Sequence, residues 1–310
     1  MSNAYPLISV IMPCFNAERH LLQGIQSVFD QTYPCLELIV INDGSTDTSL
    51  QILQSINDPR LSVLDQANQG VCKSRNRGIL AAKGDLIAFL DADDTWHPDC
   101  LSMLYQGLIS APSTQLAYCG WQNVGLPGAA GKPYIPPDYE NEHKLASLFE
   151  HCCWPIHACL TRKNAIIDAG MFDESLITSE DFLLWLKIGS QHKIIRVPEV
   201  LAFYHFHGGP QATQNKEQAA LNHWYAQQNF LQRHPEIISI LGRQHLRHLM
   251  HGELLHRGFE CYWKRDLKAA RAIFRTVMRQ GYGSIKDWFY MLPALLPFAI
   301  HRSLIQLLSR

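Results

Sequence analysis

The feature that most limits what this chain can fold into is an apolar run, residues 86–90, that leads into an acidic cluster. A glycine and charged residues bound the run, which predicts a strand buried on both faces. The strand ends at Asp91, Asp93 and Asp94. At the carboxyl edge of an open α/β sheet, such aspartates suit a hard divalent cation that also binds phosphate oxygens. A solvated acidic turn, with Asp94 or Thr95 capping the next helix, explains the same residues equally well.

Strand and helix patterns alternate through the first hundred residues, which predicts a mostly parallel sheet flanked by crossover helices. The first strand ends at Pro13 and lacks the Gly-x-Gly-x-x-Gly turn of dinucleotide-binding proteins, which argues against a nicotinamide enzyme. Ser45 or Thr46 is a candidate cap for the second helix. Expected strands are 7–12, 36–41, 61–64 and 86–90, and expected helices are 17–31, 46–56 and 71–82.

The second half of the chain contains a long loop and a helical tail. The loop, residues 123–141, is rich in Gly and Pro, and loops of this length are usually functional or disordered. From residue 214 onward the pattern is helical, with breaks expected at Pro235, Gly242, Gly258 and Gly281. Between them we expect strands at 115–121, 156–161 and 200–206, and helices at 98–110, 162–169 and 182–188.

Charge is unevenly distributed along the 310 residues. Residues 1–242 contain 15 basic and 24 acidic side chains (net −9), and residues 243–310 contain 12 basic and 4 acidic side chains (net +8). The nine cysteines fit reduced, buried thiols better than a disulfide framework. With no signal-like start, and with its longest apolar stretch, 288–300, too short to span a bilayer, the protein is expected in the cytoplasm.

Five motifs in order resemble those of family 2 inverting glycosyltransferases, which have the GT-A fold. They are SVIMPCFN (9–16), VINDGSTD (40–47), SRNRG (74–78), GDLIAFLDADD (84–94) and the pair Glu180-Asp181. The match covers about residues 5–210. It implies a GT-A catalytic domain over 1–213, with a nucleotide-sugar half at about 5–97 and an acceptor half at about 98–213. A C-terminal helical region, 214–310, follows.

The resemblance implies a pocket for the nucleotide sugar. Asp43 would accept a hydrogen bond from the imide N–H of uracil or thymine, and Phe15 would stack on the base. Arg75 would support the pocket by pairing with one of the acids. Asp91 would contact the ribose. The alternatives are a turn residue for Asp43 and a core residue for Phe15. Further donor-binding positions implied are Pro13, Asn16, Glu18 and Ala92.

The resemblance also implies a divalent cation, Mn²⁺ or Mg²⁺. Asp93 would bind it, and His207 would complete the site, although His205, where many relatives have arginine, makes the register ambiguous. An ordinary loop histidine is the alternative for His207. The ion would bridge the phosphates of the donor and stabilise the leaving diphosphate. Asp94 could orient a coordinated water or hold the turn.

The pair Glu180-Asp181 resembles the catalytic acids of the family. In an inverting transfer the acceptor hydroxyl attacks from the face opposite the diphosphate, and Asp181 would take its proton. Glu180 would position the acceptor or the loop. Because the pair opens a predicted helix, acidic residues that complement the helix dipole are the alternative.

Two segments, one cysteine-rich and one histidine-rich, are not assigned to the reaction. His151, Cys152, Cys153, His157 and Cys159 include zinc-binding residue types, but no spaced Cys-x-x-Cys pair. Four histidines at 245, 248, 251 and 256 fall on a basic helix, where a solvated or membrane-facing surface is expected.

The tail is compatible with two interpretations. Its helices could pack on the catalytic domain or on a second subunit in a homodimer, or they could form a basic amphipathic surface for anionic lipid at the inner face of the cell membrane. The resemblance implies transfer of a sugar from UDP- or dTDP-sugar to a saccharide or lipid-linked saccharide in surface polysaccharide synthesis. Alternatives are a sugar-phosphate nucleotidyltransferase and a non-catalytic sugar-nucleotide-binding relative. No nucleic-acid partner is expected.

Overall fold

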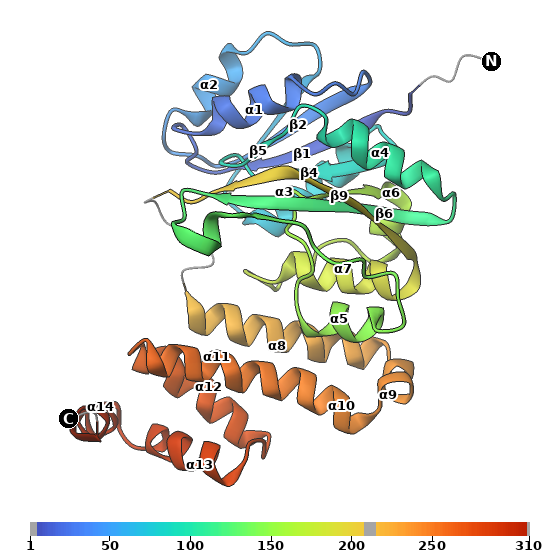
Figure 1. The fold of residues 1–310 in the computed structure, drawn as a ribbon. Coiled ribbons are helices and arrows are strands. Elements are labelled where there is room, and N and C mark those ends of the chain that lie inside the picture. The colour runs from blue at the N-terminus through green and yellow to red at the C-terminus, as the bar shows by residue number, and fades with distance from the viewer. Residues whose placement is uncertain (1–4, 208–214, 309–310) are drawn as a thin grey trace. The chain divides into compact units, whose positions relative to one another are not determined.

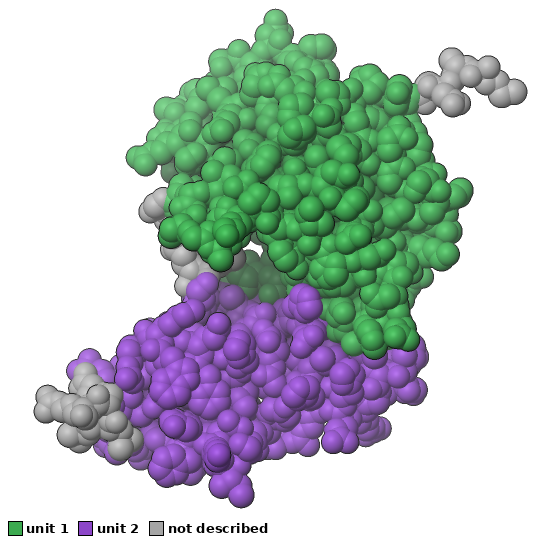
Figure 2. All heavy atoms as spheres, in the orientation of Figure 1, with its two compact units in different colours: residues 1–148, 152–209 green, residues 149–151, 210–310 purple. Residues whose placement is uncertain are grey.

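The computed structural model describes residues 5–207 and 215–308. The chain divides into two compact units (Figure 2). Unit 1 comprises Met1–Leu148 and Cys152–Gly209, and unit 2 comprises Phe149–His151 and Pro210–Arg310. Each unit is described by itself below.

Unit 1 is built on one mixed sheet with helices on its faces (Figure 1). Four strands at one side are parallel, and the antiparallel strand β8 joins them to the rest. Both faces of β2 and β4 are buried, and for β4 this confirms the prediction made from its apolar run. The strand order is β3 (Leu61–Gln66), β2 (Leu36–Asp43), β1 (Ile8–Cys14), β4 (Leu86–Phe89), β8 (Cys159–Arg162), β6 (Thr114–Val124), β9 (Lys193–His205) and β5 (Thr95–Trp96), and β7 (Pro133–Tyr134) pairs with β6.

The first strand is longer than the sequence predicted, because β1 continues through Pro13 to Cys14. Ile11 carbonyl oxygen accepts a hydrogen bond from Leu90 N, so alternate residues of β1 face β4. The pairing of β1 with β4 ends at Ile11 and Phe89, while pairing with β2 continues to Cys14. Pro13, two residues after Ile11, faces the side of β4 beyond the end of this pairing. Its missing N–H therefore removes no hydrogen bond from the sheet.

Within residues 5–207, seven helices connect these strands. They are α1 (Leu21–Phe29), α2 (Ser49–Ser55), α3 (Val71–Ala81), α4 (Cys100–Ser110), α5 (Lys144–Glu150, whose last two residues belong to unit 2), α6 (Lys163–Asp168) and α7 (Glu180–Gln191), with a 3₁₀ turn at Gly128–Gly131. Helix α3 lies close against β1, and a Cβ at Gly78 would clash with an Ile11 methyl group.

Two predicted helix caps are wrong. Helix α2 begins at Ser49, and Asp47 Oδ1, instead of Ser45 or Thr46, accepts from Ser49 N. Asn16 Oδ1 accepts from Thr46 N, so the loop after β1 supplies the partner of that turn. Asp94 and Thr95 do not cap α4, whose N-cap residue is Asp99. The predicted loop 123–141 contains the 3₁₀ turn and β7, and helix α5 after it was not predicted.

Unit 2 is helical, as the pattern from residue 214 predicted. Its elements are α8 (Lys216–Arg233), α9 (Glu236–Leu241), α10 (Arg243–Arg247), a π-helical turn (His248–Gly252), α11 (Glu253–Trp263), α12 (Leu267–Arg279), α13 (Ile285–Met291), a 3₁₀ turn labelled η4 (Leu292–Leu295) and α14 (Phe298–Leu308) (Figure 1). Within the described ranges, no helix combines the length and the apolar character needed to cross a bilayer.

The break predicted at Gly258 is wrong. Gly258 lies inside α11, where a Cβ would be 2.8 Å from the Phe274 ring, so the glycine allows α11 and α12 to pack closely. The apolar side of α12 is buried in unit 2 and includes Leu267, Phe274 and Val277. This face of the predicted amphipathic tail is therefore core and not surface.

Candidate active site

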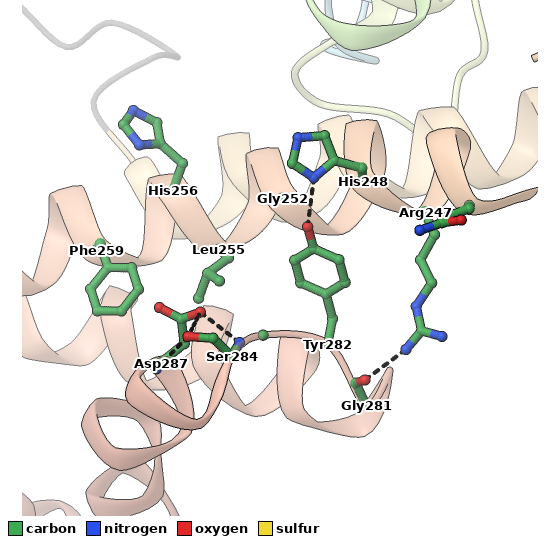
Figure 3. A pocket seen from close by; sticks show the side chains of 12 residues that line it. Arg247, His248, Gly252, Leu255, His256, Phe259, Gly281, Tyr282, Ser284 and Asp287 are labelled. Atoms are coloured by element: carbon green, nitrogen blue, oxygen red, sulfur yellow. Dashed lines mark hydrogen bonds between the residues drawn. The ribbon is translucent and has the colours of Figure 1, made fainter.

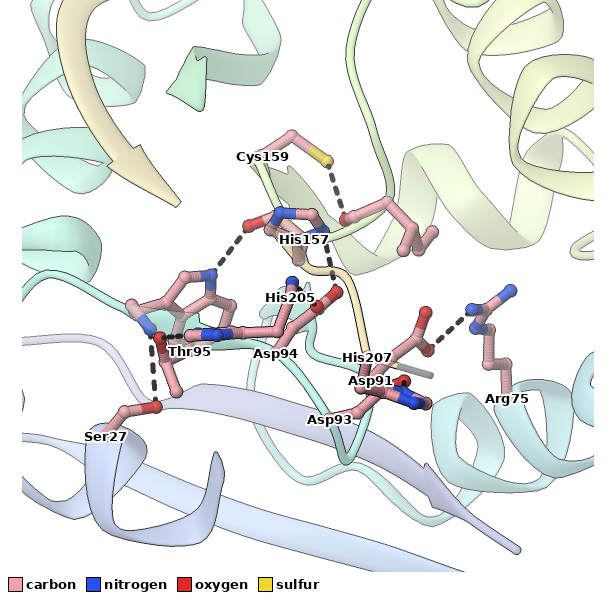
Figure 4. A network of polar contacts seen from close by, with 12 residues as sticks. Ser27, Arg75, Asp91, Asp93, Asp94, Thr95, His157, Cys159, His205 and His207 are labelled. Atoms are coloured by element: carbon pink, nitrogen blue, oxygen red, sulfur yellow. Dashed lines mark hydrogen bonds and ion pairs between the residues drawn. The ribbon is translucent and has the colours of Figure 1, made fainter. Parts of the chain in front are cut away.

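Two partly exposed aspartates follow β4 at the carboxyl edge of the sheet. The side chains of Asp91 and Asp93 are 27% and 33% exposed. Asp94 N donates to the Asp91 carbonyl oxygen at 3.0 Å, which closes a turn. The Asp91 carboxylate pairs with Arg75, and the Asp93 carboxylate lies against His207 (Figure 4). The predicted acidic edge is therefore a tight turn that presents two acids outward.

Arg75 of α3 joins two distant acids. Its Nη2 lies 2.7 Å from Asp91 Oδ1, and its Nη1 lies 2.8 Å from Glu180 Oε1. The guanidinium is buried and lies over the Phe172 ring at 5.4 Å. Burial alone would lower the pKa of Arg75, but the charges of Asp91 and Glu180 outweigh it and raise that pKa. The sequence predicted a pair with one acid, and the structure shows a bridge between two.

Glu180 and Asp181 form the first turn of α7, after Ser179 in a left-handed conformation with φ 64°. Burial, and next the charge of Asp181, raise the pKa of Glu180 to about 7, although Arg75 opposes both effects. Burial also raises the pKa of Asp181. Asp181 Oδ1 accepts from Phe182 N at 2.7 Å, and the Cys152 thiol lies 3.7 Å from Oδ2. An acid with a raised pKa is suited to receive a proton near neutral pH.

Asp93 and His207 meet across the sheet edge, with His207 Nε2 2.8 Å from Asp93 Oδ2 (Figure 4). The ring of His20 stacks on His207 at 4.6 Å between centroids. Within the described residues, no group of three or more acids, histidines or cysteines could hold a metal ion. One carboxylate and one imidazole fit an ion that takes its other ligands from a diphosphate and water.

The Asp94 side chain points inward, so Asp94 is not part of a solvated turn. Its side chain is 1% exposed, its Oδ1 accepts from His205 N at 2.9 Å, and its Oδ2 lies 3.3 Å from His157 Nδ1. Burial, followed by the charges of Asp91 and Asp93, raises the pKa of Asp94. Burial lowers the pKa of His157 to about 4, so this ring is neutral at pH 7. The His205 contact ties the turn after β4 to β9, and the His157 contact ties it to the segment before β8.

Asp43, at the end of β2, is 4% exposed and accepts three hydrogen bonds from its own chain. The donors are Gln66 Nε2 and Gln69 N on Oδ1, and Gly70 N on Oδ2. The carboxylate therefore holds the loop that leads into α3. Its predicted contact with a base remains a prediction, and the structure adds this second role.

The loop after β1 carries the other predicted donor-binding residues. Phe15 is 51% exposed, so it is not a core residue. Asn16 has a left-handed backbone with φ 51°, and Glu18 Oε2 accepts from Thr48 Oγ1 at 2.7 Å, which lowers the pKa of Glu18. Pro13 is half-buried in β1, and Ala92 is buried in the turn after β4. These loops are tied together by Asn16 and Glu18.

Sequence patterns did not predict the contacts that His20, Cys152 and His157 make in this region. The cysteine-rich segment was considered for zinc, but its members face different partners. Cys153 Sγ donates to Ser147 O, and Cys159 Sγ donates to Ile156 O. Only proximity in the fold brings Cys152 to Asp181 and His157 to Asp94, so no sequence spacing could reveal either contact.

Comparison with known families supplies the decisive observation. The family model described as "Glycosyl transferase family 2" matches residues 9–174, more than half of the chain. The chain belongs to glycosyltransferase family 2. An uncharacterized glycosyltransferase of Haemophilus influenzae is 31% identical over 232 residues, which are 70% of this chain and 69% of that protein. The chondroitin synthase of Pasteurella multocida is 24% identical over 71% of this chain, which spans 22% of the synthase.

Solved structures of similar glycosyltransferases confirm the GT-A fold of this chain. Staphylococcus aureus TarS 1–349 in complex with UDP-GlcNAc aligns with a TM-score of 0.57 and 19% identity, covering 86% of this chain and 83% of that one. The mannosyltransferase PcManGT of Pyrobaculum calidifontis in complex with GDP-Man and Mn²⁺ aligns with a TM-score of 0.60 and 16% identity, covering 98% and 84%. At these identities the likeness is one of fold.

Proposed function

We propose that this glycosyltransferase is an inverting, metal-dependent enzyme that transfers a sugar from UDP- or dTDP-sugar to a saccharide or lipid-linked saccharide. The observation that carries the proposal is the bridge by Arg75 between Asp91 and Glu180. It couples the acid proposed to contact the donor ribose to the helix turn that bears the proposed base. The two sides of the reaction are thereby held at one edge of the sheet.

The donor would lie across the loops after β1, β2 and β4. Phe15, with its exposed ring, is suited to stack on the base, and Asp43 keeps capacity for one further donor beyond its three hydrogen bonds. Asp91 would contact the ribose, since Arg75 takes only its Oδ1. Pro13, Asn16, Glu18 and Ala92 would shape the pocket through the loops that they hold.

Asp93 and His207 would hold Mn²⁺ or Mg²⁺. The bound ion would act as a Lewis acid on the diphosphate. In the neighbourhood of this pair, the ring of His20 packs on His207 and fixes its orientation.

Asp181 would serve as the base. The acceptor hydroxyl oxygen forms a bond to the anomeric carbon, the bond from that carbon to the diphosphate breaks, and the diphosphate leaves with the electron pair. The hydroxyl proton passes to Asp181, whose raised pKa favours its acceptance. Glu180, held by Arg75, would position the acceptor or the loop.

The acceptor would bind beside the 123–143 segment. The enzyme would act in cell-surface polysaccharide synthesis, in the cytoplasm at the inner face of the membrane. Relatives named as chondroitin and hyaluronan synthases of Pasteurella multocida support this context. Under this proposal, residues 1–213 form the catalytic domain and 214–310 form an accessory helical region.

The proposal is tested by replacing the base. First, thermal shift with Mn²⁺ against a panel of sugar nucleotides selects the donor. Asp181→Asn should then lower kcat by roughly 10²–10⁴-fold and leave the donor Kd unchanged, because only proton transfer is lost. Release of nucleoside diphosphate, with bacterial membrane extract as the acceptor source, measures kcat.

The matched control is Asp168→Asn, an exposed acid at the end of α6, which should keep wild-type turnover. Wild-type turnover in Asp181→Asn would refute the base assignment. Equal losses in both variants would refute it as well.

A further inference from the structure

Consecutive short elements at the end of unit 2 expose apolar side chains. Ile285 and Phe289 on α13 are 91% and 74% exposed. Soluble proteins tolerate scattered exposed apolar residues, but clusters mark interaction sites. The exposed apolar residues from α13 to α14 are Ile285, Phe289, Tyr290, Leu292, Leu295, Leu296, Phe298, Ile300 and Leu304.

Aromatic rings make part of this surface continuous. The exposed Trp263 ring lies 5.8 Å from the Tyr290 ring, and the Phe289 ring lies 6.2 Å from it. Tryptophan and tyrosine combine an apolar ring with a polar group, which suits the boundary between lipid headgroups and acyl chains. We call the exposed apolar residues of 285–304, with Trp263, the aromatic face.

The backbone below the aromatic face is fixed and not a frayed end. Arg275 donates from Nε to Ala294 O at 2.8 Å and from Nη2 to Leu295 O at 3.0 Å. Arg271 donates to Leu296 O at 2.9 Å. A capping box between Ser284 and Asp287 fixes the start of α13. The exposed side chains are therefore presented by an ordered surface.

Basic residues accompany the aromatic face. Residues 264–304 contain eight basic and two acidic side chains. Of the two acids, Asp266 caps α12 and Asp287 belongs to the capping box, so both are occupied locally. The exposed basic residues include Lys264, Lys286 and Arg302.

A groove of about 810 Å³ borders the aromatic face (Figure 3). Phe259 lines the groove, and its ring lies 6.0 Å from Tyr290. Arg247 and His256 line it as well, with Asp287 as the acidic member. His248 Nδ1 and the Tyr282 hydroxyl lie 2.9 Å apart within it. The groove thus extends the aromatic face with polar and cationic groups.

We propose that the aromatic face docks peripherally on an anionic lipid bilayer. Apolar rings would enter the interface while the surrounding lysines and arginines face lipid phosphates. A second copy of the chain is a poorer occupant, because a symmetric contact would bring two strongly basic surfaces together. Docking requires neither a bound donor nor transfer, so it can fail without affecting the proposed reaction.

Sedimentation of the full chain with phosphatidylglycerol vesicles at low salt tests the proposal. Binding should exceed that to phosphatidylcholine vesicles at least tenfold and should weaken as salt rises. Ile285→Glu with Phe289→Glu should lower vesicle binding at least tenfold. Ile240→Glu, which alters an exposed apolar residue on α9, is the matched control and should bind as wild type.

Lys286→Glu with Arg302→Glu provides a second variant pair that leaves the apolar residues intact. It should weaken binding to anionic vesicles at least tenfold. Absence of wild-type binding at low salt would overturn the proposal, as would an equal loss in Ile240→Glu. A wild-type dimer in sedimentation velocity that Ile285→Glu with Phe289→Glu converts to monomer would instead assign the face to self-association.

Discussion

Two turns of the same sheet use their aspartates in different ways. In the turn after β2, Asp43 is almost fully buried and accepts three hydrogen bonds from its own chain. In the turn after β4, Asp91 and Asp93 remain partly exposed, and each has a cationic or imidazole partner on one oxygen. The first turn is built to hold a loop, while the second keeps carboxylate oxygens available for a ligand.

The difference follows from where the backbone donors lie. The segment that enters α3 turns its N–H groups at Gln69 and Gly70 toward Asp43, so they find their acceptor there. In the turn after β4, it is Asp94 that stabilises the turn, because its carboxylate accepts a hydrogen bond from His205 N. Because Asp94 makes this buried contact, the structural part does not fall to Asp91 and Asp93, whose side chains stay partly exposed.

The largest effect is expected from Arg75→Met. This variant leaves the partly buried Asp91 and Glu180 carboxylates without their shared cation, which should lower the free energy of unfolding by about 3–5 kcal/mol and also abolish transfer. Chemical denaturation measures the first effect. Arg77→Met, two residues along α3 and half-buried, is the control and should change stability far less. Similar stability in the two variants would contradict the bridge.

Asp93→Asn should separate chemistry from stability. If Asp93 binds the ion, transfer should fall on the order of a thousandfold, since a Lewis acid contributes several kcal/mol to stabilising the transition state. The free energy of unfolding should stay near wild type because the side chain is one-third exposed. The assay is a Mn²⁺ titration of turnover, with Asp85→Asn as an exposed control. Unchanged Mn²⁺ dependence would refute the metal role.

Asp43→Asn should show the opposite pattern. An amide cannot replace both carboxylate oxygens as acceptors, so the N–H of Gln69 or Gly70 loses its partner. The free energy of unfolding should fall by about 1–3 kcal/mol. Denaturant melts of Asp43→Asn and Asp85→Asn, run side by side, measure the difference. A thousandfold loss of transfer without loss of stability would show that Asp43 acts mainly on the donor.

The strands of the sheet could be predicted from the sequence, because strands buried on both faces are continuous apolar runs. The family could be predicted as well, because its polar motifs directly follow these strands at the carboxyl edge of the sheet. It could not predict that Arg75 contacts two acids, since Glu180 lies 105 residues further along the chain. The stacking of His20 on His207 was missed for the same reason.

Pattern also identified apolar faces without showing what covers them. The spacing in α12 suggested an amphipathic surface, but the structure buries that face, and the exposed residues lie on α13, η4 and α14. Gly258 was interpreted as a helix break, although it serves close packing against Phe274. Periodicity gives the side of a helix that is apolar, and only tertiary contacts decide whether it is core.

The smallest expected effect concerns the pKa of Asp181, which the Cys152 thiol influences. The thiol lies 3.7 Å from Oδ2 and helps to lower a pKa that burial has raised. If Asp181 is the base, transfer requires its carboxylate form, so activity should fall as pH drops through this pKa, above the ordinary range of aspartate. Cys152→Ala removes the thiol and should move the acidic limb of the kcat/KM profile to higher pH. Cys153→Ala, whose thiol donates to Ser147 O, should leave the limb in place. A limb that stays fixed in Cys152→Ala, or moves to lower pH, would show that Asp181 does not set it.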